Sequence, residues 1–372
     1  MLGDSIMCAN SSQVAILNGS KIQFFNGNSR ALLSEINTDG DAKNNHNKAI
    51  CCALSWDGCY FASCNEVKSV NLWKCDRNNW SIVSKRQISK RPTSILFTQD
   101  SKQILIADKA GFVTRLSIDN YNEEGDICLG HISIILCMAL SPNNKYLITG
   151  DRDEKIRISN YPHTYDISAF CLGHTEFVST IAILDDELMV SGSGDGTIKL
   201  WNYLSGQQLL SEDIKDSLQQ RCSSSQYQLK ECTETIISNI SYCPKYNVVA
   251  ICCEHIKMVL LYHINKNNFE LNYMQEIELI DVPMKTSFIN ESLWILISNI
   301  DEPLEIWNLF KDSCTDSTHK TIKVEIEPII DPLASALKGD HFRDCCNVES
   351  YLSQVKRKRM ESFSDEISKK SR

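Results

Sequence analysis

The 372-residue sequence lacks the features that would place it in a membrane or mark it for export. It has no run of about 18 apolar residues, so we expect no membrane-spanning helix. Its start, MLGDSIMCANSSQVAIL, has neither a basic segment nor a long apolar stretch, so we expect no secretory signal. Hydrophobic residues still make up 42% of the chain, which is enough for a sizeable core.

The 17 cysteines lack the spacings of a metal site or a disulfide framework. No Cys-x-x-Cys occurs, and no Cys/His cluster has zinc spacing. Most cysteines lie in apolar, strand-like runs such as AICCALS and VVAICCEH, where a thiol packs as a small hydrophobic side chain. Without an export signal, this pattern predicts a reducing compartment, the cytosol or the nucleus.

Motifs for catalysis and nucleotide binding are also missing. No G-x-S-x-G occurs, and the eight histidines are scattered without partners at ligand spacing. The glycine-rich SGSGDGT at 191–197 lacks the ending of a phosphate-binding loop and precedes TIKLW, so it predicts a β-hairpin turn. We therefore expect no catalytic, cofactor-binding or metal-binding residues in this chain, and a function that rests on what a rigid scaffold binds.

Charge is unevenly distributed along the chain. The net charge is −9, yet residues 351–372 contain seven basic and three acidic residues, so the remainder carries −13. An acidic body does not bind phosphates by itself, but it can dock a basic partner. The basic run in the tail predicts a nuclear import signal, with a solvated tail as the alternative; it consists of Lys356, Arg357, Lys358 and Arg359.

Internal repetition predicts the fold. The segments CLGHISIILCMALSPNNKYLITGDRDEKIRIS and CLGHTEFVSTIAILDDELMVSGSGDGTIKLW align with each other. Their histidines, His131 and His174, lie 43 residues apart, and Asp153 and Asp195 lie 42 apart. A period of about 40–45 residues that opens with Gly-His and closes with Trp is typical of WD40 blades. The second segment closes with Trp201, where the first has a serine. We expect these two histidines, two aspartates and the tryptophan to be structural, with the aspartates stabilising turns.

The full pattern predicts an all-β WD40 β-propeller with seven blades, and six or eight as alternatives. More degenerate copies occupy 49–74, 92–118, 235–264 and 282–310. The N-terminal strands in 13–26 are predicted to complete a seventh blade with residues near 321–328, which would remove exposed strand edges. The propeller should then span 1–335, with polar insertions near 35–48 and 212–234, followed by a charged, partly disordered tail at 336–372.

Three stretches between about 128 and 210 resemble a known family: LITGDRDEKIRIS, FCLGHTEFVSTIAI and SGSGDGTIKLWNYLSGQQL. They are similar to the WD-repeat, non-catalytic subunit of tRNA (guanine-N7) methyltransferase, called Wuho in insects. The resemblance implies a heterodimer with a Rossmann-type catalytic subunit, which binds S-adenosylmethionine and methylates guanosine at position forty-six of tRNA. It also implies that this chain stabilises the enzyme, reaches tRNA mainly through it, and is mainly nuclear, with the cytoplasm as an additional location.

A second class of WD40 protein is the alternative. A general WD40 scaffold, such as a ubiquitin-ligase substrate receptor, often has an arginine two residues after a Trp-Asp pair. The corresponding places here are LWKC, LWNY and IWNL, which lack that signal. An enzyme is disfavoured further, because no catalytic constellation is visible in the sequence.

The charged stretch DRDEKIR at 151–157 is the candidate site. Six of its seven residues are charged, and it connects two predicted strands. A solvated hairpin is one explanation, with the last arginine alternating with inward isoleucines and pointing outward. Together with the family resemblance, the stretch predicts a methyltransferase-binding face made by Arg152, Glu154, Lys155 and Arg157.

Overall fold

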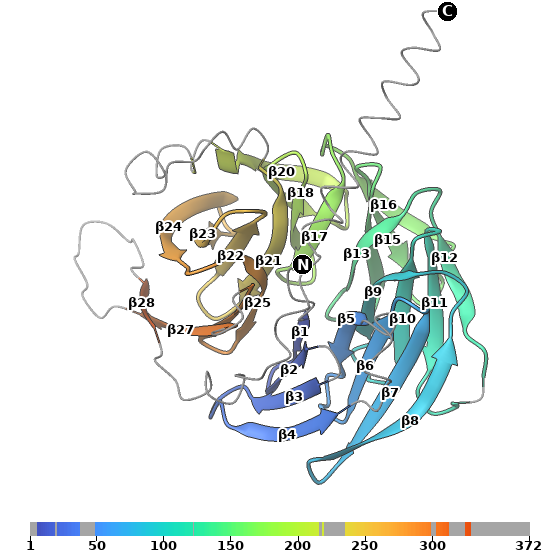
Figure 1. Cartoon of the computed structure of the whole chain (residues 1–372). Helices are drawn as coiled ribbons and strands as arrows, with labels where there is room; N and C mark the ends of the chain where they lie inside the picture. The colour runs from blue at the N-terminus through green and yellow to red at the C-terminus, as the bar shows by residue number, and fades with distance from the viewer. Residues whose placement is uncertain are drawn as a thin grey trace, which may run out of the picture.

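Seven four-stranded antiparallel sheets form the computed structural model, arranged as blades in a ring (Figure 1). The structure describes residues 6–18, 21–37, 49–121, 123–215, 218, 235–298, 303–311 and 324–328. In every blade the strands pair in chain order, so each sheet is a simple meander. The predicted all-β propeller of seven blades is therefore confirmed.

The first four blades are numbered along the chain. Blade 1 contains β1 (Ile6–Ala9), β2 (Gln13–Asn18), β3 (Lys21–Asn26) and β4 (Leu32–Asn37). Blade 2 contains β5 (Ala49–Leu54), β6 (Tyr60–Asn65), β7 (Ser69–Asp76) and β8 (Asn79–Gln87). Blade 3 contains β9 (Pro92–Phe97), β10 (Gln103–Asp108), β11 (Phe112–Ser117) and β12 (Asp126–Gly130). Blade 4 contains β13 (Ile135–Leu140), β14 (Tyr146–Asp151), β15 (Ile156–Asn160) and β16 (Ile167–Cys171).

The remaining three blades complete the ring. Blade 5 contains β17 (Val178–Ile183), β18 (Leu188–Ser193), β19 (Thr197–Asn202) and β20 (Gln207–Asp213). Blade 6 contains β21 (Ile237–Cys243), β22 (Val248–Cys253), β23 (Met258–Asn265) and β24 (Glu270–Glu278). Blade 7 contains β25 (Pro283–Ile289), β26 (Ser292–Ile297), β27 (Leu304–Lys311) and β28 (Val324–Pro328).

The ring closes differently from the prediction. The N-terminal strands do not share a sheet with C-terminal residues, because β1–β4 form a blade of their own and β28 completes β25–β27. Closure comes from packing of β1 against β25, without backbone pairing between the two ends of the chain. The predicted mixed blade is wrong. Two strands that the sequence pattern did not reveal, β1 before residues 13–26 and β4 after them, complete the N-terminal blade.

Burial is greatest in the second strands of the blades, whereas innermost strands such as β5 and β13 are mostly half-buried. The second strands β18, β22 and β26 are buried along their whole length, and their runs LMVSGS, VVAICC and SLWILI are correspondingly apolar or small. The outer strands β12 and β16 are mostly exposed. The core lies between adjacent sheets: one cluster joins Ile148 and Ile158 of blade 4 to Val178 and Trp201 of blade 5.

Two predicted insertions begin later than expected. β4 includes residues 35–37 and β20 includes 212–213, so strands occupy the first residues of both ranges. The tail at 336–372, with its basic run at 356–359, lies outside the described residues. Within the described part of the chain, no helix has the length and apolar character needed to cross a membrane.

Candidate partner-binding face

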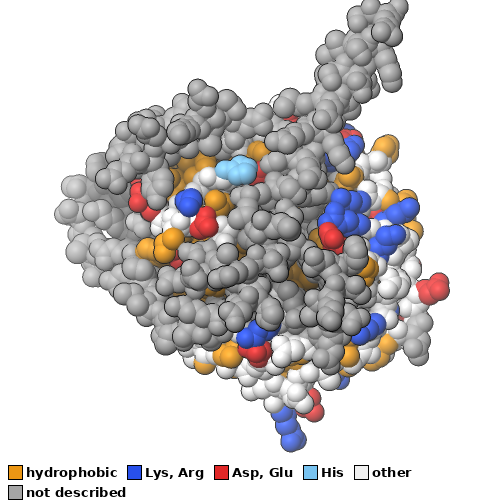
Figure 2. Space-filling view, in the orientation of Figure 1, with side chains coloured by type: hydrophobic (Ala, Val, Ile, Leu, Met, Phe, Trp, Pro, Cys, Tyr) orange, Lys and Arg blue, Asp and Glu red, His pale blue; other side chains and the backbone are white. Residues whose placement is uncertain are grey.

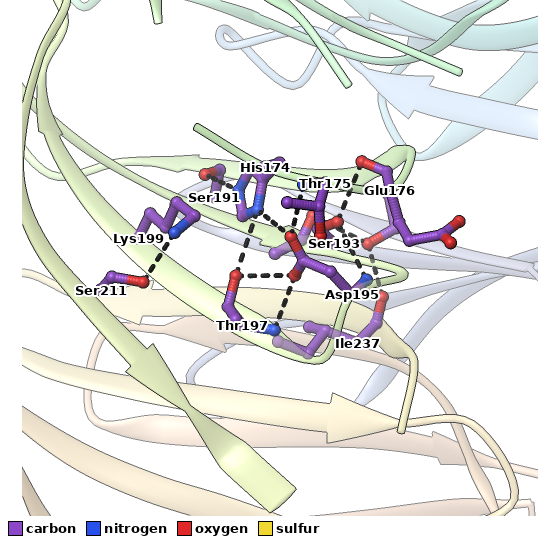
Figure 3. A network of polar contacts seen from close by, with 12 residues as sticks. His174, Thr175, Glu176, Ser191, Ser193, Asp195, Thr197, Lys199, Ser211 and Ile237 are labelled. Atoms are coloured by element: carbon purple, nitrogen blue, oxygen red, sulfur yellow. Dashed lines mark hydrogen bonds and ion pairs between the residues drawn. The ribbon is translucent and has the colours of Figure 1, made fainter. Parts of the chain in front are cut away.

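Blade 5 holds a buried polar network around His174 (Figure 3). The Nδ1 atom of His174 lies 3.0 Å from Asp195 Oδ2, and its Nε2 lies 2.7 Å from Ser191 Oγ. Trp201 donates its indole N–H to the same Ser191 oxygen at 2.7 Å. A neutral histidine satisfies every partner, with Nδ1–H donating to the carboxylate and Nε2 accepting from the serine hydroxyl. The structure thus brings together His174, Asp195 and Trp201 as a structural network.

Asp195 fixes the turn that follows β18. Its carboxylate accepts hydrogen bonds from the backbone N–H groups of Thr175 at 2.9 Å and Thr197 at 2.8 Å. Burial alone would raise the pKa of Asp195, but the hydrogen bonds from His174 and Thr197 hold that pKa well below its usual range. The carboxylate is therefore charged at neutral pH and serves the fold.

Blade 4 builds the matching network with a different aspartate. His131 Nδ1 lies 3.1 Å from Asp151 Oδ2, and Nε2 lies 2.7 Å from Thr149 Oγ1. Asp151 also accepts hydrogen bonds from the N–H groups of Asp153 and Lys155. The prediction that Asp153 is the structural turn residue is wrong. Asp153 occupies the position of the blade 5 aspartate, but its side chain is 46% exposed and lies beside an arginine.

Arg157 is bound within the propeller and does not point freely outward. Its Nε donates to Ser159 Oγ at 2.9 Å, and its terminal nitrogens donate to the carbonyls of Gly130 at 2.9 Å and Thr164 at 2.8 Å. The Thr164 hydroxyl also donates to the Cys128 carbonyl. These contacts tie the β15–β16 loop to β12 of blade 3. Arg157 thus binds the Ser159 hydroxyl at the place where blade 5 has Trp201, and its contact with a partner stays a prediction.

The hairpin between β14 and β15 carries the other predicted side chains. Lys155 is exposed, Arg152 is 42% exposed, and Glu154 is half-buried. Glu154 adopts φ +74°, and Gly196 has φ +79° at the same place in blade 5. A side chain in this left-handed conformation is strained where glycine is not. Lys68 adopts φ +65° at the same place in blade 2, so the left-handed conformation belongs to this type of turn and does not by itself mark a functional residue.

Exposed apolar side chains surround this hairpin. Ile132, in the loop between β12 and β13, is fully exposed, and Leu172, directly after β16, is 62% exposed. The N–H of Arg152 donates to the Ile134 carbonyl, which ties the hairpin to the loop that carries Ile132. Leu172 follows Cys171, the residue paired with the first position of β15.

Two phenylalanines extend the exposed surface along the outer edge. Phe112 pairs with Gly130 at the end of β12, and Phe170 pairs with Arg157 across β15 and β16. We call this surface the blade 3–4 face and define it by Phe112, Ile132, Arg152, Glu154, Lys155, Phe170 and Leu172. Figure 2 shows Lys and Arg side chains beside hydrophobic ones on this side of the ring, at the right of the view.

Sequence reasoning identified three charged members of the face and missed all four apolar ones. Leu129 and Leu172 illustrate why: both precede a Gly-His pair, yet Leu129 is buried and Leu172 is exposed. The two positions have the same local pattern, so only the packing of neighbouring strands distinguishes them. In the described part of the chain, no group of three or more His, Cys, Asp or Glu side chains could hold a metal ion.

Seven meandering blades with buried His–Asp pairs define a WD40 β-propeller scaffold. The family model described as the tRNA methyltransferase TRM82 WD40 domain matches residues 25–125 and 119–319. The chain belongs to this family.

Curated relatives carry consistent names. The chain is 34% identical over 270 residues to the tRNA (guanine-N(7)-)-methyltransferase non-catalytic subunit wdr4 of Danio rerio, covering 71% of this chain and 63% of the relative. It therefore spans less than two thirds of that relative's length. The subunit of the same name from Homo sapiens is 30% identical over 317 residues, covering 81% of this chain and 74% of the relative. The subunit named wuho from Drosophila grimshawi is 41% identical over 147 residues, covering 40% of this chain and 38% of the relative.

Solved structures share the fold at low identity. A chain of the mitotic checkpoint complex matches with a TM-score of 0.68 and 13% identity, over 82% of this chain and 87% of that chain. The structure of U3-55K matches with a TM-score of 0.63 and 18% identity, over 79% and 88% respectively. These similarities support the propeller fold alone.

Proposed function

We propose that this chain is the non-catalytic subunit of a tRNA (guanine-N7) methyltransferase and that it binds the catalytic subunit through the blade 3–4 face. The names of the curated relatives support the class. The observation that carries the location is the exposed apolar rim around a strained, charged hairpin, since Ile132 and Leu172 are large side chains left in water. The charged side chains of the hairpin, Arg152, Glu154 and Lys155, set the orientation of the bound partner.

Activation in this proposal is a population shift, with no chemistry performed by this chain. Burial of Ile132 and Leu172 against the partner contributes binding free energy, and Arg152, Glu154 and Lys155 pair with complementary charges that fix the register. Binding then favours the ordered, active conformation of the enzyme. The partner binds S-adenosylmethionine and makes most contacts with tRNA, since residues 1–350 of this chain carry a net charge of −13 and do not attract phosphates.

A nuclear location is part of the same proposal. The run KRKR at 356–359 has the density of basic residues that import receptors bind. A fluorescent fusion of the full chain should accumulate in the nucleus, and replacement of all four basic residues by Gln should leave it in the cytoplasm. Equal distribution of both fusions would contradict this assignment.

Reconstitution with the catalytic subunit tests the function. The two subunits should co-purify in equal amounts and form N7-methylguanosine at position forty-six of tRNA much faster than the catalytic subunit alone. Normal tRNA methylation in cells that lack this protein would contradict the proposed function.

The location of the interface is tested separately. Glu154→Lys and Leu172→Ser should each weaken the heterodimer by tenfold or more, because one reverses a charge and the other removes an apolar anchor. Neither should change the melting temperature of the isolated propeller by more than a few degrees. Ile280→Ser is the matched control, since Ile280 is 60% exposed on the opposite part of the ring, after β24. Wild-type affinity in both hairpin-side variants would place the interface elsewhere.

A further inference from the structure

Two cysteines lie directly opposite each other at one end of blade 2. Cys59 immediately precedes β6 and Cys75 is on β7, and the Cys75 N–H donates to the Cys59 carbonyl at 2.8 Å. The register of the two strands continues through this pair, because the next residues, Tyr60 and Lys74, are Cα partners. Opposite residues that share such a backbone bond have Cα atoms about 5.5 Å apart. This separation lies within the range of about 4.4–6.8 Å that a disulfide spans.

The two thiols are on the same side of the sheet, which faces blade 1. Side chains alternate along a strand, so Cys59 shares its side with Phe61, and Cys75 shares its side with Trp73. The centroids of the Phe61 and Trp73 rings lie 5.4 Å apart, and both rings belong to the core between blades 1 and 2. Cys75 packs against the edge of the same core. The opposed pair of thiols thus continues the opposed pair of rings.

The pair lies where the ladder between β6 and β7 ends. The Cys59 N–H donates to Asp57 Oδ1 at 2.9 Å, so it stabilises the preceding turn. Opposite Cβ atoms are about 4.5–5.5 Å apart, and a disulfide needs about 3.5–4.5 Å, so closure requires a small movement of this end. A disulfide that is strained and exposed is readily reduced. The geometry therefore favours a reversible bond over a permanent one.

Blade 2 contains a second pair of opposed cysteines in a different environment. Cys51 and Cys64 are Cα partners across β5 and β6. Cys64 is fully buried, however, whereas Cys59 is exposed and Cys75 is half-buried. A thiol exchanges with a dissolved disulfide only where the reagent can reach it. Of the two pairs, only Cys59 and Cys75 combine disulfide geometry with access from solvent.

We propose that Cys59 and Cys75 form a reversible redox-modification site, which a low-molecular-weight disulfide such as oxidised glutathione converts to an intramolecular disulfide. The Cys59 thiolate attacks one sulfur of the reagent, forms a mixed disulfide and releases one reduced thiol. The Cys75 thiolate then attacks the Cys59 sulfur and releases the second. Two protein thiols are oxidised, one reagent disulfide is reduced, and the two protons pass to the two thiols released. The new bond joins β6 to β7 and stabilises blade 2.

The rate of this exchange depends on ionisation of the exposed thiol. Partial burial, and then the nearby Asp57 carboxylate, raise the pKa of Cys59. Exchange should therefore be slow at neutral pH and faster at mildly alkaline pH, because the thiolate is the nucleophile.

The site is separate from the proposed partner interface. Cys59 is at the start of β6, whereas the turn at the other end of β6 contains Lys68 and corresponds to the turn that contains Glu154 in blade 4. Oxidation should therefore leave binding of the catalytic subunit unchanged, and failure of the proposed interface would not affect the redox site.

Disulfide mapping on the full-length protein tests the pairing. The reduced protein is incubated with oxidised glutathione at mildly alkaline pH, free thiols are alkylated, and unreduced peptides are identified by mass spectrometry. The Cys59–Cys75 linkage should exceed the mixed disulfide of Cys59 with glutathione on the order of tenfold, because the second thiol is held nearby at a high effective concentration. It should exceed the Cys51–Cys64 linkage by a similar factor of roughly ten, because Cys64 is inaccessible. An excess of reduced glutathione should restore both thiols.

Variants test the order of the two steps. Cys75→Ser removes the second nucleophile, so Cys59 should remain as the mixed disulfide with glutathione. Cys51→Ser is the matched control from the other pair and should leave the Cys59–Cys75 linkage intact. The oxidised wild-type protein should melt a few degrees above the reduced protein, and Cys75→Ser should show no such rise.

Three results on the wild-type protein would overturn the proposal, and none needs a variant to fold. The first is a mixed disulfide on Cys59 that persists without linkage to Cys75. The second is equal yields of the two linkages, which would show that access does not distinguish the pairs. The third is a Cys59–Cys75 linkage that reduced glutathione does not reverse.

Discussion

Blades 4 and 5 contain the same histidine network but complete it with different residues. Blade 5 uses a turn aspartate, a glycine and a tryptophan: Asp195, Gly196 and Trp201. At the corresponding places, blade 4 has Asp153, Glu154 and Ser159, and the missing interactions come from Asp151 and Arg157. Blade 5 therefore closes its turn with residues that serve only the fold. In blade 4, Asp151 and Arg157 make these contacts instead. The charged side chains at the hairpin tip are therefore not required for the turn, and we expect them to bind a partner.

The largest expected difference between the two blades lies at the tryptophan position. Trp201 is fully buried in the core shared by blades 4 and 5, so Trp201→Ala should lower the free energy of unfolding by about 3–5 kcal/mol. Ser159→Ala, at the matching place in blade 4, should cost only about 1 kcal/mol for one lost hydrogen bond. Urea denaturation of both variants measures the two values, and similar losses would show that the blades do not differ in this way.

Arg157 should be the next most sensitive position. Arg157→Met removes three hydrogen bonds, two within blade 4 and one to the Gly130 carbonyl of blade 3, and we expect a loss of about 2 kcal/mol in unfolding free energy. Arg157→Lys should recover little of this loss, because an ammonium does not reproduce the planar fork of the guanidinium. Both values come from the same denaturation assay. Full rescue by lysine would mean that charge alone holds this contact.

The network could be predicted from the sequence where both repeats agree, and could not where they diverge. Gly-His recurs 43 residues apart and a turn aspartate recurs 42 residues apart, so the sequence alone predicts a structural role for His174 and Asp195. The shift of the contact from Asp153 to Asp151 could not be predicted, because either carboxylate can accept hydrogen bonds from this turn. Ring closure was missed for a related reason: β1 and β4 have short, partly polar sequences, so a pattern of apolar alternation does not distinguish them from loops.

The pH dependence of stability should distinguish the charged turn of blade 5 from a neutral one. The folded-state pKa of Asp195 lies below its ordinary value of 3.8, so this group contributes stability above about pH 4 and loses it as the pH falls toward the folded-state pKa. Asp195→Asn should cost about 1–2 kcal/mol near neutral pH, and the difference from wild type should shrink below pH 4. Denaturant titrations at several pH values measure this difference, and a penalty independent of pH would argue against a charged Asp195.

The smallest expected effect is at the turn itself, where stability and binding should move in opposite directions. Glu154→Gly gives blade 4 the residue that blade 5 has at Gly196, and it relieves a side chain at φ +74°. We expect a gain of up to about 1 kcal/mol in unfolding free energy, measured by denaturation. The same variant should bind the catalytic subunit less tightly, because it lacks the carboxylate of the blade 3–4 face. A variant that is more stable and binds equally well would show that the strain at Glu154 serves neither the fold nor the partner.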